Sequence, residues 1–178
     1  MTHAKLRKAL RLQHVPRWSI IPTINKQTVA EHSHGVAAIA IWLIRESAEN
    51  PMVDKAEVLK YAIEHDAWES VTGDTPSVAK ARGLIEDKTP KDDVSTMTKG
   101  IVKLADFLEA LVFLKTEIAM GNTLADNVFN YVYDAATHFY NGTDWLRAYI
   151  NYNDFFPLWR NFSIEANATL HPGMLRDE

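Results

Sequence analysis

Cysteine is absent from this chain of 178 residues. Its absence excludes disulfide bonds, thiolate zinc sites and a catalytic cysteine. Histidine, aspartate and glutamate remain as the strong metal ligands that the chain offers. Any metal site in this protein is therefore built from nitrogen and oxygen atoms.

Long apolar runs are also missing. The longest run extends from Gly35 to Ile44, about half of the roughly 20 residues that a membrane-spanning helix needs. The first residues lack the apolar block that is typical of a signal peptide. We therefore expect no membrane partner and a cytoplasmic protein.

Acidic residues do not occur among the first 30 positions, which carry six lysines and arginines, whereas the whole chain has a net charge of −4. A basic arm beside an acidic body can attract a phosphate ligand, although solvated charges on a first helix would give the same pattern. Nucleic acid is not expected as a partner, because the body is acidic and no basic stripe is interleaved with aromatic residues.

Segments in which polar and apolar residues alternate are too short to indicate a sheet. Apolar residues recur instead at helical spacing, between capping residues and glycine stop signals. The length and the 47% apolar content fit one domain with one core. We predict an all-α protein, a compact helical bundle in which residues 1–178 form a single domain. The expected helices cover about 3–14, 28–49, 54–69, 76–82, 95–120, 123–141 and 154–169.

An adjacent pair, His65-Asp66, lies near the end of one expected helix. Helical spacing puts Asp66 on the same face as three apolar residues, Leu59, Ala62 and Ile63, so its carboxylate is expected to point toward the core. A buried carboxylate is costly unless it is paired or binds a metal ion. The pair therefore requires a partner from another part of the chain.

Two other expected helices each carry an inward ionisable side chain. His32 shares a helical face with the apolar residues Val36 and Ile39. Asp106 interrupts a strongly apolar stretch, where a lone carboxylate would otherwise be a defect. Both side chains can therefore meet the His65-Asp66 pair in the core.

Taken singly, these residues have ordinary explanations. An inward histidine is often a hydrogen-bonded core residue, and an aspartate near a helix end is often a cap or a salt-bridge partner. Together they form a two-nitrogen, two-oxygen set that suits Mn²⁺, Co²⁺, Fe²⁺ or Zn²⁺ and leaves positions open for water. The set consists of His32, His65, Asp66 and Asp106.

The order of these residues along the chain resembles the HD-domain metal-dependent phosphohydrolases, which are named for an adjacent His-Asp pair. Five motifs make the likeness closer, and they look equally like the bacterial YfbR-type 5′-deoxynucleotidases and the small phage dATP triphosphohydrolases known as DatZ. The resemblance covers about residues 15–120. The motifs are Arg17-Trp18, Val29-Ala-Glu-His-Ser33, His65-Asp-Ala-Trp-Glu69, Thr72-Gly-Asp-Thr-Pro76 and Val102-Lys-Leu-Ala-Asp106.

The resemblance implies that the four-residue set holds a divalent metal ion. Zn²⁺, Co²⁺ or Mn²⁺ is expected there, with Mg²⁺ as a further candidate at the phosphates. It also implies that Glu69 orients or deprotonates the attacking water, provided that the helix continues past His65 and keeps both residues on one face. A surface salt bridge is the alternative role for Glu69.

Substrate-binding residues follow from the same resemblance. Arg17 matches a phosphate-binding arginine, whose planar fork suits two phosphate oxygens. Asp74 matches an acid that contacts the 3′-hydroxyl of deoxyribose, although Asp74 would also suit a turn. Both residues are therefore expected to contact the nucleotide.

Further residues are expected around the base, the sugar and the outer phosphates. Trp18, Ile20 and Pro76 match positions that enclose the sugar and base, although core packing would also explain Trp18. Lys80 and Lys103 lie near motif residues and would meet the outer phosphates of a triphosphate. Exposed helix charges are the alternative for both lysines.

The resulting hypothesis is metal-dependent hydrolysis of a 2′-deoxynucleotide at the α-phosphorus. A compact segment between Asp66 and Asp106, together with the lysines, favours dATP, with deoxyadenosine and triphosphate as the products; the preference for adenine follows from the resemblance alone. The alternative substrate is a deoxynucleoside monophosphate, from which a 5′-deoxynucleotidase would release phosphate.

Two other classes of function remain as alternatives. A non-catalytic HD module that binds nucleotides is disfavoured by the complete ligand set and Glu69. A phosphodiesterase acting on cyclic nucleotides or oligonucleotides lacks the support of a basic groove. The resemblance also implies a homo-oligomer, a dimer or larger, and the host cytoplasm if the protein is phage-encoded.

Overall fold

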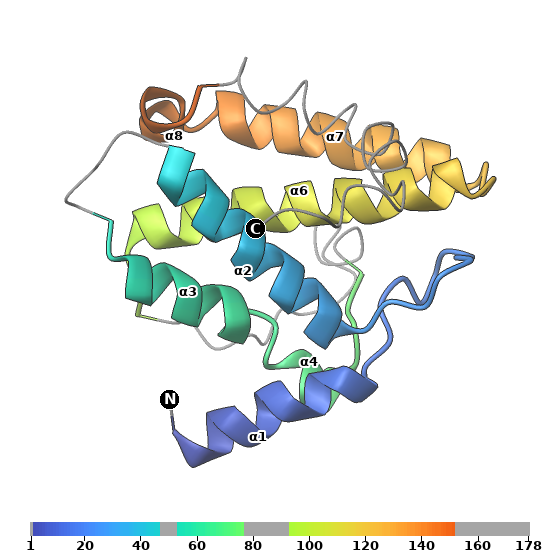
Figure 1. The fold of residues 1–178 in the computed structure, drawn as a ribbon, viewed down its shortest axis with the longest axis horizontal. Helices are drawn as coiled ribbons and strands as arrows, with labels where there is room; N and C mark the ends of the chain where they lie inside the picture. The colour runs from blue at the N-terminus through green and yellow to red at the C-terminus, as the bar shows by residue number, and fades with distance from the viewer. Residues whose placement is uncertain (1, 47–52, 77–92, 152–178) are drawn as a thin grey trace, which may run out of the picture.

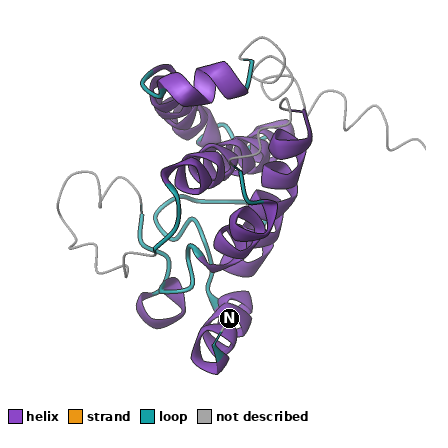
Figure 2. Cartoon of the chain, turned by 90° about the vertical axis from the view of Figure 1, so that its left-hand side faces the viewer, coloured by secondary structure: helices purple, strands orange, loops and turns teal. Residues whose placement is uncertain are grey.

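The structure is a computed structural model that describes residues 2–46, 53–76 and 93–151. Within these ranges the chain forms helices, turns and loops, and its β-structure is limited to one isolated antiparallel bridge between Pro16 and Thr28 (Figure 2). The all-α prediction is confirmed. The expected helix over 154–169 and, apart from Pro76, the one over 76–82 lie outside the described residues. None of the described helices is long and apolar enough to cross a membrane.

The helices of the described part follow one another as labelled in Figure 1. They agree with four expected helices to within a few residues, the usual uncertainty of helix ends. The expected helix over 54–69 is instead divided, and α8 was not expected. The elements are α1 (His3–Arg11), η1 (Leu12–His14), α2 (Val29–Glu46), α3 (Lys55–Glu64), α4 (Glu69–Thr72), α6 (Thr96–Ala119), α7 (Ala125–Asn141) and α8 (Asp144–Tyr149).

Helix α6 is the central element, packed against α2, α3 and α7 (Figure 1). Its buried leucines and other apolar residues recur every three or four positions, which gives one helix faces toward several neighbours. Ser95 caps its N-terminus by accepting a hydrogen bond from the Thr98 amide. Gly121, with φ of +95°, follows its C-terminus in the left-handed conformation that glycine adopts readily. The fully buried side chains of α6 include Ile101, Leu104, Leu108, Leu111 and Leu114.

The 15–28 loop connects η1 to α2 and is closed on itself by backbone hydrogen bonds. The amide of Arg17 donates to the carbonyl of Gln27 over 2.8 Å, and the amide of Val29 donates to the carbonyl of Val15 over 2.9 Å. These bonds hold the start of the loop beside the start of α2. Arg17 is thereby brought close to the first turns of that helix.

The chain turns between α3 and α4, so the prediction of one helix over 54–69 is wrong. Amide-to-carbonyl bonds of the i to i−3 type, such as Glu69 to Asp66 at 2.9 Å, replace the helical pattern across the turn. Ile63, expected on the buried face with Asp66, is 42% exposed. In a regular helix adjacent side chains diverge by about 100°. The turn instead allows His65 and Asp66 to approach one point.

Candidate metal centre

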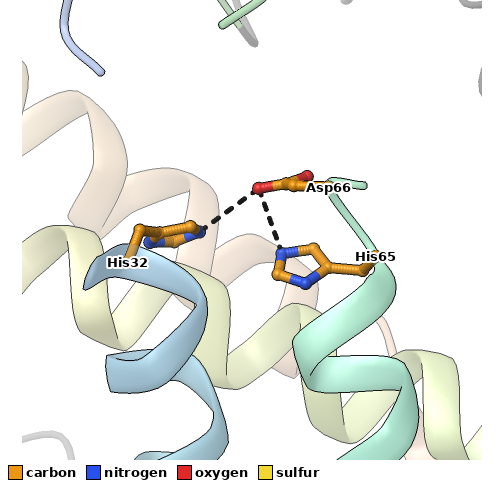
Figure 3. Close-up of side chains that lie close together, drawn as sticks. All are labelled: His32, His65 and Asp66. Carbon is orange, nitrogen blue, oxygen red and sulfur yellow. Dashed lines mark ion pairs between the residues drawn. The ribbon is translucent and has the colours of Figure 1, made fainter. Parts of the chain in front are cut away.

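Three predicted ligands converge between α2 and the turn that follows α3 (Figure 3). One ligand atom from each of His32, His65 and Asp66 lies within 4.8 Å of the other two. Oδ2 of Asp66 is 3.5 Å from Nε2 of His32 and 3.3 Å from Nε2 of His65. This spacing places two imidazole nitrogens and a carboxylate oxygen around one small volume.

Asp106 approaches the same volume from α6. Its Oδ1 lies 3.2 Å from Nε2 of His32, and its Oδ2 accepts a hydrogen bond from Nζ of Lys103 over 2.7 Å. The four predicted ligands therefore come from three separate parts of the chain. The carboxylates of Asp106 and Asp66 both face Nε2 of His32.

The ligand atoms of both histidines suit a metal ion. Nδ1 of His65 lies 2.8 Å from the carbonyl of Ala62, so a proton on Nδ1 is held there and Nε2 keeps its lone pair. Nε2 of His32 and Nε2 of His65 are buried and make no hydrogen bond of good geometry within the described residues. Buried nitrogens of this kind are costly unless something binds them, and together with carboxylate oxygens they fit a divalent cation.

The electrostatics of the cluster favour positive charge. Burial and the Arg17 guanidinium lower the pKa of His32, but the neighbouring carboxylates of Asp106 and Glu109 outweigh them and raise it to about 9. Burial alone would raise the pKa of Asp106, whereas Lys103 and the two cluster histidines hold it well below its usual range. Asp106 is therefore ionised at neutral pH, as a metal ligand must be.

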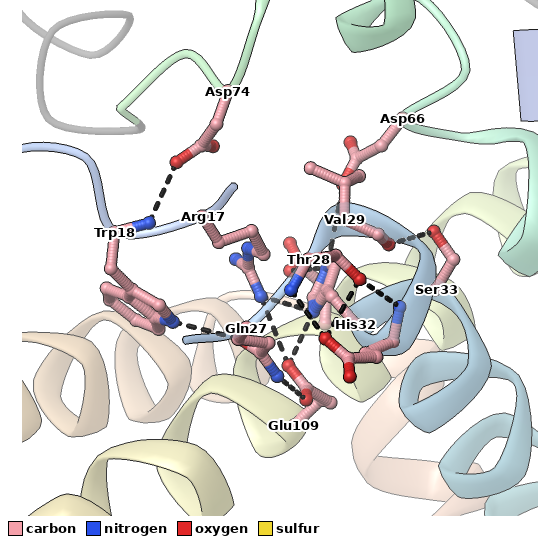
Figure 4. Close-up of polar contacts among 12 residues, drawn as sticks. Arg17, Trp18, Gln27, Thr28, Val29, His32, Ser33, Asp66, Asp74 and Glu109 are labelled. Carbon is pink, nitrogen blue, oxygen red and sulfur yellow. Dashed lines mark hydrogen bonds and ion pairs between the residues drawn. The ribbon is translucent and has the colours of Figure 1, made fainter. Parts of the chain in front are cut away.

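Glu109 is a residue of this site that the sequence analysis missed (Figure 4). Its Oε2 lies 2.5 Å from Nδ1 of His32 and 3.2 Å from Nη1 of Arg17. Its Oε1 accepts a hydrogen bond from Nε2 of Gln27 over 2.6 Å. Glu109 follows Asp106 by three positions on α6 and so shares its helical face, a spacing that could have revealed it. Gln27 carries no comparable signal in the sequence.

Arg17 lies at the edge of the cluster. Its side chain is 14% exposed, and beside its ion pair with Glu109 its Nη1 closely contacts Nδ1 of His32. The guanidinium carbon is 5.1 Å from the ring centroid of Trp18. The structure thus brings the predicted phosphate-binding arginine to the predicted metal ligands.

Trp18 has a strained backbone, with φ of +61°. A bulky residue rarely adopts this conformation, which costs about 1–3 kcal/mol and persists only when its surroundings fix it. Its amide donates to Oδ2 of Asp74 over 3.0 Å, and its indole N–H donates to Oε1 of Gln27 over 2.9 Å. Its ring stacks on Phe113 at a centroid distance of 5.3 Å. These contacts hold the tryptophan beside Arg17.

Glu69 begins α4 rather than continuing α3, so the expected shared helical face with His65 is wrong. Its side chain is 6% exposed, and its Oε1 accepts a hydrogen bond from the amide of Thr75 over 3.4 Å. The surface salt bridge that was the alternative for Glu69 does not suit so buried a side chain.

The remaining predicted substrate-binding residues lie on three different segments of the chain. Ile20 is 66% exposed on the 15–28 loop, and Pro76 is partly buried at the end of a described segment. Lys103 contacts Asp106 and lies over the ring of Phe107, 4.4 Å from its centroid. Lys80 lies outside the described residues.

Known proteins resemble this chain in sequence and fold. Residues 6–87 match the family described as 5′-deoxynucleotidase YfbR-like. The dATP triphosphohydrolase of Salmonella phage PMBT28 is 36% identical in an alignment 127 residues long, and the match covers 61% of this chain and 64% of that protein. The dATP triphosphohydrolase of Acinetobacter phage SH-Ab 15497 is 31% identical in an alignment 143 residues long, and the match covers 64% of this chain and 68% of that protein. The chain therefore spans slightly less than two thirds of the Salmonella phage protein.

A solved structure shows the same fold. The cyanophage S-2L HD phosphohydrolase DatZ, bound to dA and one catalytic Zn²⁺ ion, superposes with a TM-score of 0.60 at 22% identity. The match covers 78% of this chain and 84% of that one. The helical bundle is thus of the HD-domain type.

Proposed function

The chain belongs to the YfbR-like HD-domain phosphohydrolases, and we propose that it catalyses metal-dependent hydrolysis of a 2′-deoxynucleotide at the α-phosphorus. The observation that carries this proposal is a cluster of three possible ligand residues, with Asp106 in contact with one of them, beside a nearly buried arginine. The names of the two phage relatives support a deoxynucleotide substrate.

The four predicted ligands hold the metal ion in this proposal. A divalent ion bound there supplies a water molecule of lowered pKa and polarises a phosphate oxygen. Two imidazole nitrogens and two carboxylate oxygens suit Zn²⁺, Co²⁺ or Mn²⁺, and the DatZ structure holds Zn²⁺. The ligands are His32, His65, Asp66 and Asp106.

Arg17 and Glu69 act on the reacting groups. Arg17 stabilises the negative charge that develops on the phosphoryl oxygens, and its position against Glu109 keeps the guanidinium in place before the substrate binds. Glu69 orients the attacking water and accepts its proton, a role that is supported by its burial and by the bond from its amide to the carbonyl of Asp66. The bond between phosphorus and the 5′-oxygen breaks, and the 5′-oxygen leaves with a proton as the nucleoside hydroxyl.

Trp18 and Asp74 bind the nucleoside. The indole ring is held by Phe113 and Gln27, so it offers a fixed wall to the sugar and base. A carboxylate can accept several hydrogen bonds, so Asp74 can contact the 3′-hydroxyl while it holds the amide of Trp18. Ile20 would close the same pocket from its exposed position on the loop.

We favour dATP as the substrate, with deoxyadenosine and triphosphate as products. Lys103 supports this choice because its ammonium group lies beside the cluster and its side chain is 46% exposed, within reach of an outer phosphate. Pro76 and Lys80 keep their predicted roles at the base and the outer phosphates. A 5′-deoxynucleotidase is the second candidate, because the matching family carries that description.

Product analysis tests the proposal. The purified protein, supplied separately with Zn²⁺, Co²⁺, Mn²⁺ or Mg²⁺, is incubated with dATP, dGTP, dAMP and ATP, and triphosphate is resolved from orthophosphate. Deoxyadenosine and intact triphosphate from dATP are expected. Orthophosphate released only from dAMP would select the nucleotidase, and no turnover with any metal ion would refute both candidates.

A homo-oligomer is also expected, and light scattering measures its mass in solution.

A further inference from the structure

The carboxylate of Glu109 contacts both the predicted metal-ligand cluster and the 15–28 loop (Figure 4). Its Oε2 faces His32 and Arg17, and its Oε1 faces Gln27. The side chain is 8% exposed. A buried carboxylate with three donor groups around it is a fixed acceptor.

The contact with His32 determines which imidazole nitrogen faces the cluster with a lone pair. An ionised carboxylate can only accept hydrogen bonds, so Nδ1 of His32 donates its proton to Oε2 of Glu109. Nε2 is then left as the ligand atom. The Ala62 carbonyl has the same relation to His65, so each cluster histidine has its own acceptor behind it.

The contact with Gln27 extends the network into the loop. Gln27 donates to Glu109 through Nε2, accepts from the indole of Trp18 through Oε1, and accepts from the amide of Arg17 through its backbone carbonyl. The loop residues proposed to bind nucleotide are therefore attached to the same carboxylate as a proposed metal ligand.

Gly35 is independent evidence that helix α2 leaves space for the side chain of Glu109. This glycine lies within α2, where it weakens the helix relative to alanine. A Cβ at position 35 would lie 2.7 Å from Cγ and 3.2 Å from Oε1 of Glu109. Helix α2 thus lacks a side chain where Glu109 passes it.

We propose that Glu109 is a positioning residue that orients His32 for metal binding and couples it to the nucleotide-binding loop through Gln27. The metal ion in this inference rests on the proposed function, but the coupling does not depend on which nucleotide is hydrolysed. The two can therefore fail separately, because metal affinity is measured without any nucleotide.

The principal test is a calorimetric titration of the chelator-treated full chain with Co²⁺ or Zn²⁺. Glu109→Gln keeps the shape of the side chain but removes its charge and one acceptor oxygen. We expect its Kd for the metal ion to rise about 10–100-fold, as when the partner behind a ligating histidine is lost. Gly35→Ala, which displaces Glu109 without changing its chemistry, should weaken metal binding in the same direction.

Glu117→Gln is the matched control. Glu117 is also buried on α6 and holds the same loop through the amides of Ile24 and Asn25, and the structure gives it no contact with His32. If Glu109 had only a structural role, Glu109→Gln and Glu117→Gln would have the same affinity for the metal ion. We expect the control to keep the wild-type metal Kd within about twofold, a difference of about 0.4 kcal/mol or less by RT ln 2.

A polarity swap tests the link to the loop. In Glu109→Gln the new amide NH₂ meets the NH₂ of Gln27, whereas adding Gln27→Glu gives that NH₂ an acceptor again. Glu109→Gln should therefore also raise the KM for the nucleotide. The double variant should return this KM toward the wild-type value and still bind the metal ion more weakly than the wild type. The inference would be overturned if Glu109→Gln kept the wild-type Kd for the metal ion. It would also be overturned if Glu109→Gln and Glu117→Gln raised this Kd equally. An unrecovered KM in the double variant would overturn the coupling.

Discussion

Glu117 fixes the far end of the 15–28 loop, and replacing it by glutamine should destabilise the protein. Its side chain is completely buried. Its carboxylate accepts the amides of Ile24 at 2.6 Å and Asn25 at 2.8 Å, and the side-chain NH₂ of Asn122 at 2.8 Å. Glutamine preserves the shape but offers one acceptor oxygen and turns an NH₂ toward a donor.

The magnitude follows from the bonds that are lost. Glutamine loses least with its oxygen in the place of Oε2, where it keeps the bonds from Ile24 and Asn122 and loses only the one from Asn25. A hydrogen bond to a charged acceptor is worth about 1.5–3 kcal/mol, and the two bonds that remain weaken because their acceptor becomes neutral. Asn25 is exposed, so water solvates its freed amide and the lower part of that range applies. We expect the free energy of unfolding to fall by about 2–3 kcal/mol, which lowers Tm by about 4–12 °C for a chain of this size.

The pH dependence of this loss gives a second check. Burial alone would raise the pKa of Glu117, but hydrogen bonds from Asn122 and from the amides of Asn25 and Ile24 outweigh it and hold the pKa below 4.5. A lowered carboxyl pKa adds stability above the unfolded value, and this stability is lost as pH falls through the folded value. Urea denaturation at several pH values should therefore show the gap between wild type and Glu117→Gln closing below pH 4.5. A constant gap, or one under about 0.5 kcal/mol at pH 7, would refute the reasoning.

Three further predictions concern the cluster. Asp106→Asn should abolish turnover while the circular dichroism spectrum stays unchanged, and near-normal activity would remove this ligand assignment. Because the pKa of His32 is raised to about 9 without a metal ion, metal binding at pH 7 should displace its proton; titrations in buffers of different ionisation enthalpy measure this release, and identical heats in all buffers would contradict it. Arg17→Lys keeps the charge but loses the planar fork, so kcat/KM should fall at least about tenfold, a barrier increase of about 1.4 kcal/mol; an unchanged kcat/KM would show that the fork does not hold phosphate.

The helices that the sequence predicted well have clear end signals. Ser95 and Gly121 bound α6, and its apolar residues repeat over many turns. Helix α8, Asp144–Tyr149, is fewer than two turns long, too short for periodicity to reveal it. The break after Glu64 was not predicted because the following turn contains neither glycine nor proline.

The candidate site was predictable to the extent that it breaks local patterns. His32 and Asp106 stand out because an apolar helix face does not tolerate them without partners. Gln27 lies in a loop, where a polar residue is ordinary, so its contact with Glu109 depends on tertiary structure. The orientation of Trp18 likewise depends on Asp74 and Phe113, which are distant in sequence.

Hydrolysis in ¹⁸O-labelled water tests the central claim most directly. The protein with Zn²⁺ or Co²⁺ is incubated with dATP, and in parallel with dAMP, and the products are analysed by mass spectrometry. Attack of water on the α-phosphorus predicts one ¹⁸O atom in the released triphosphate or phosphate and none in deoxyadenosine, with no product in the presence of chelator. Label in deoxyadenosine, or release that persists without metal, would contradict the account.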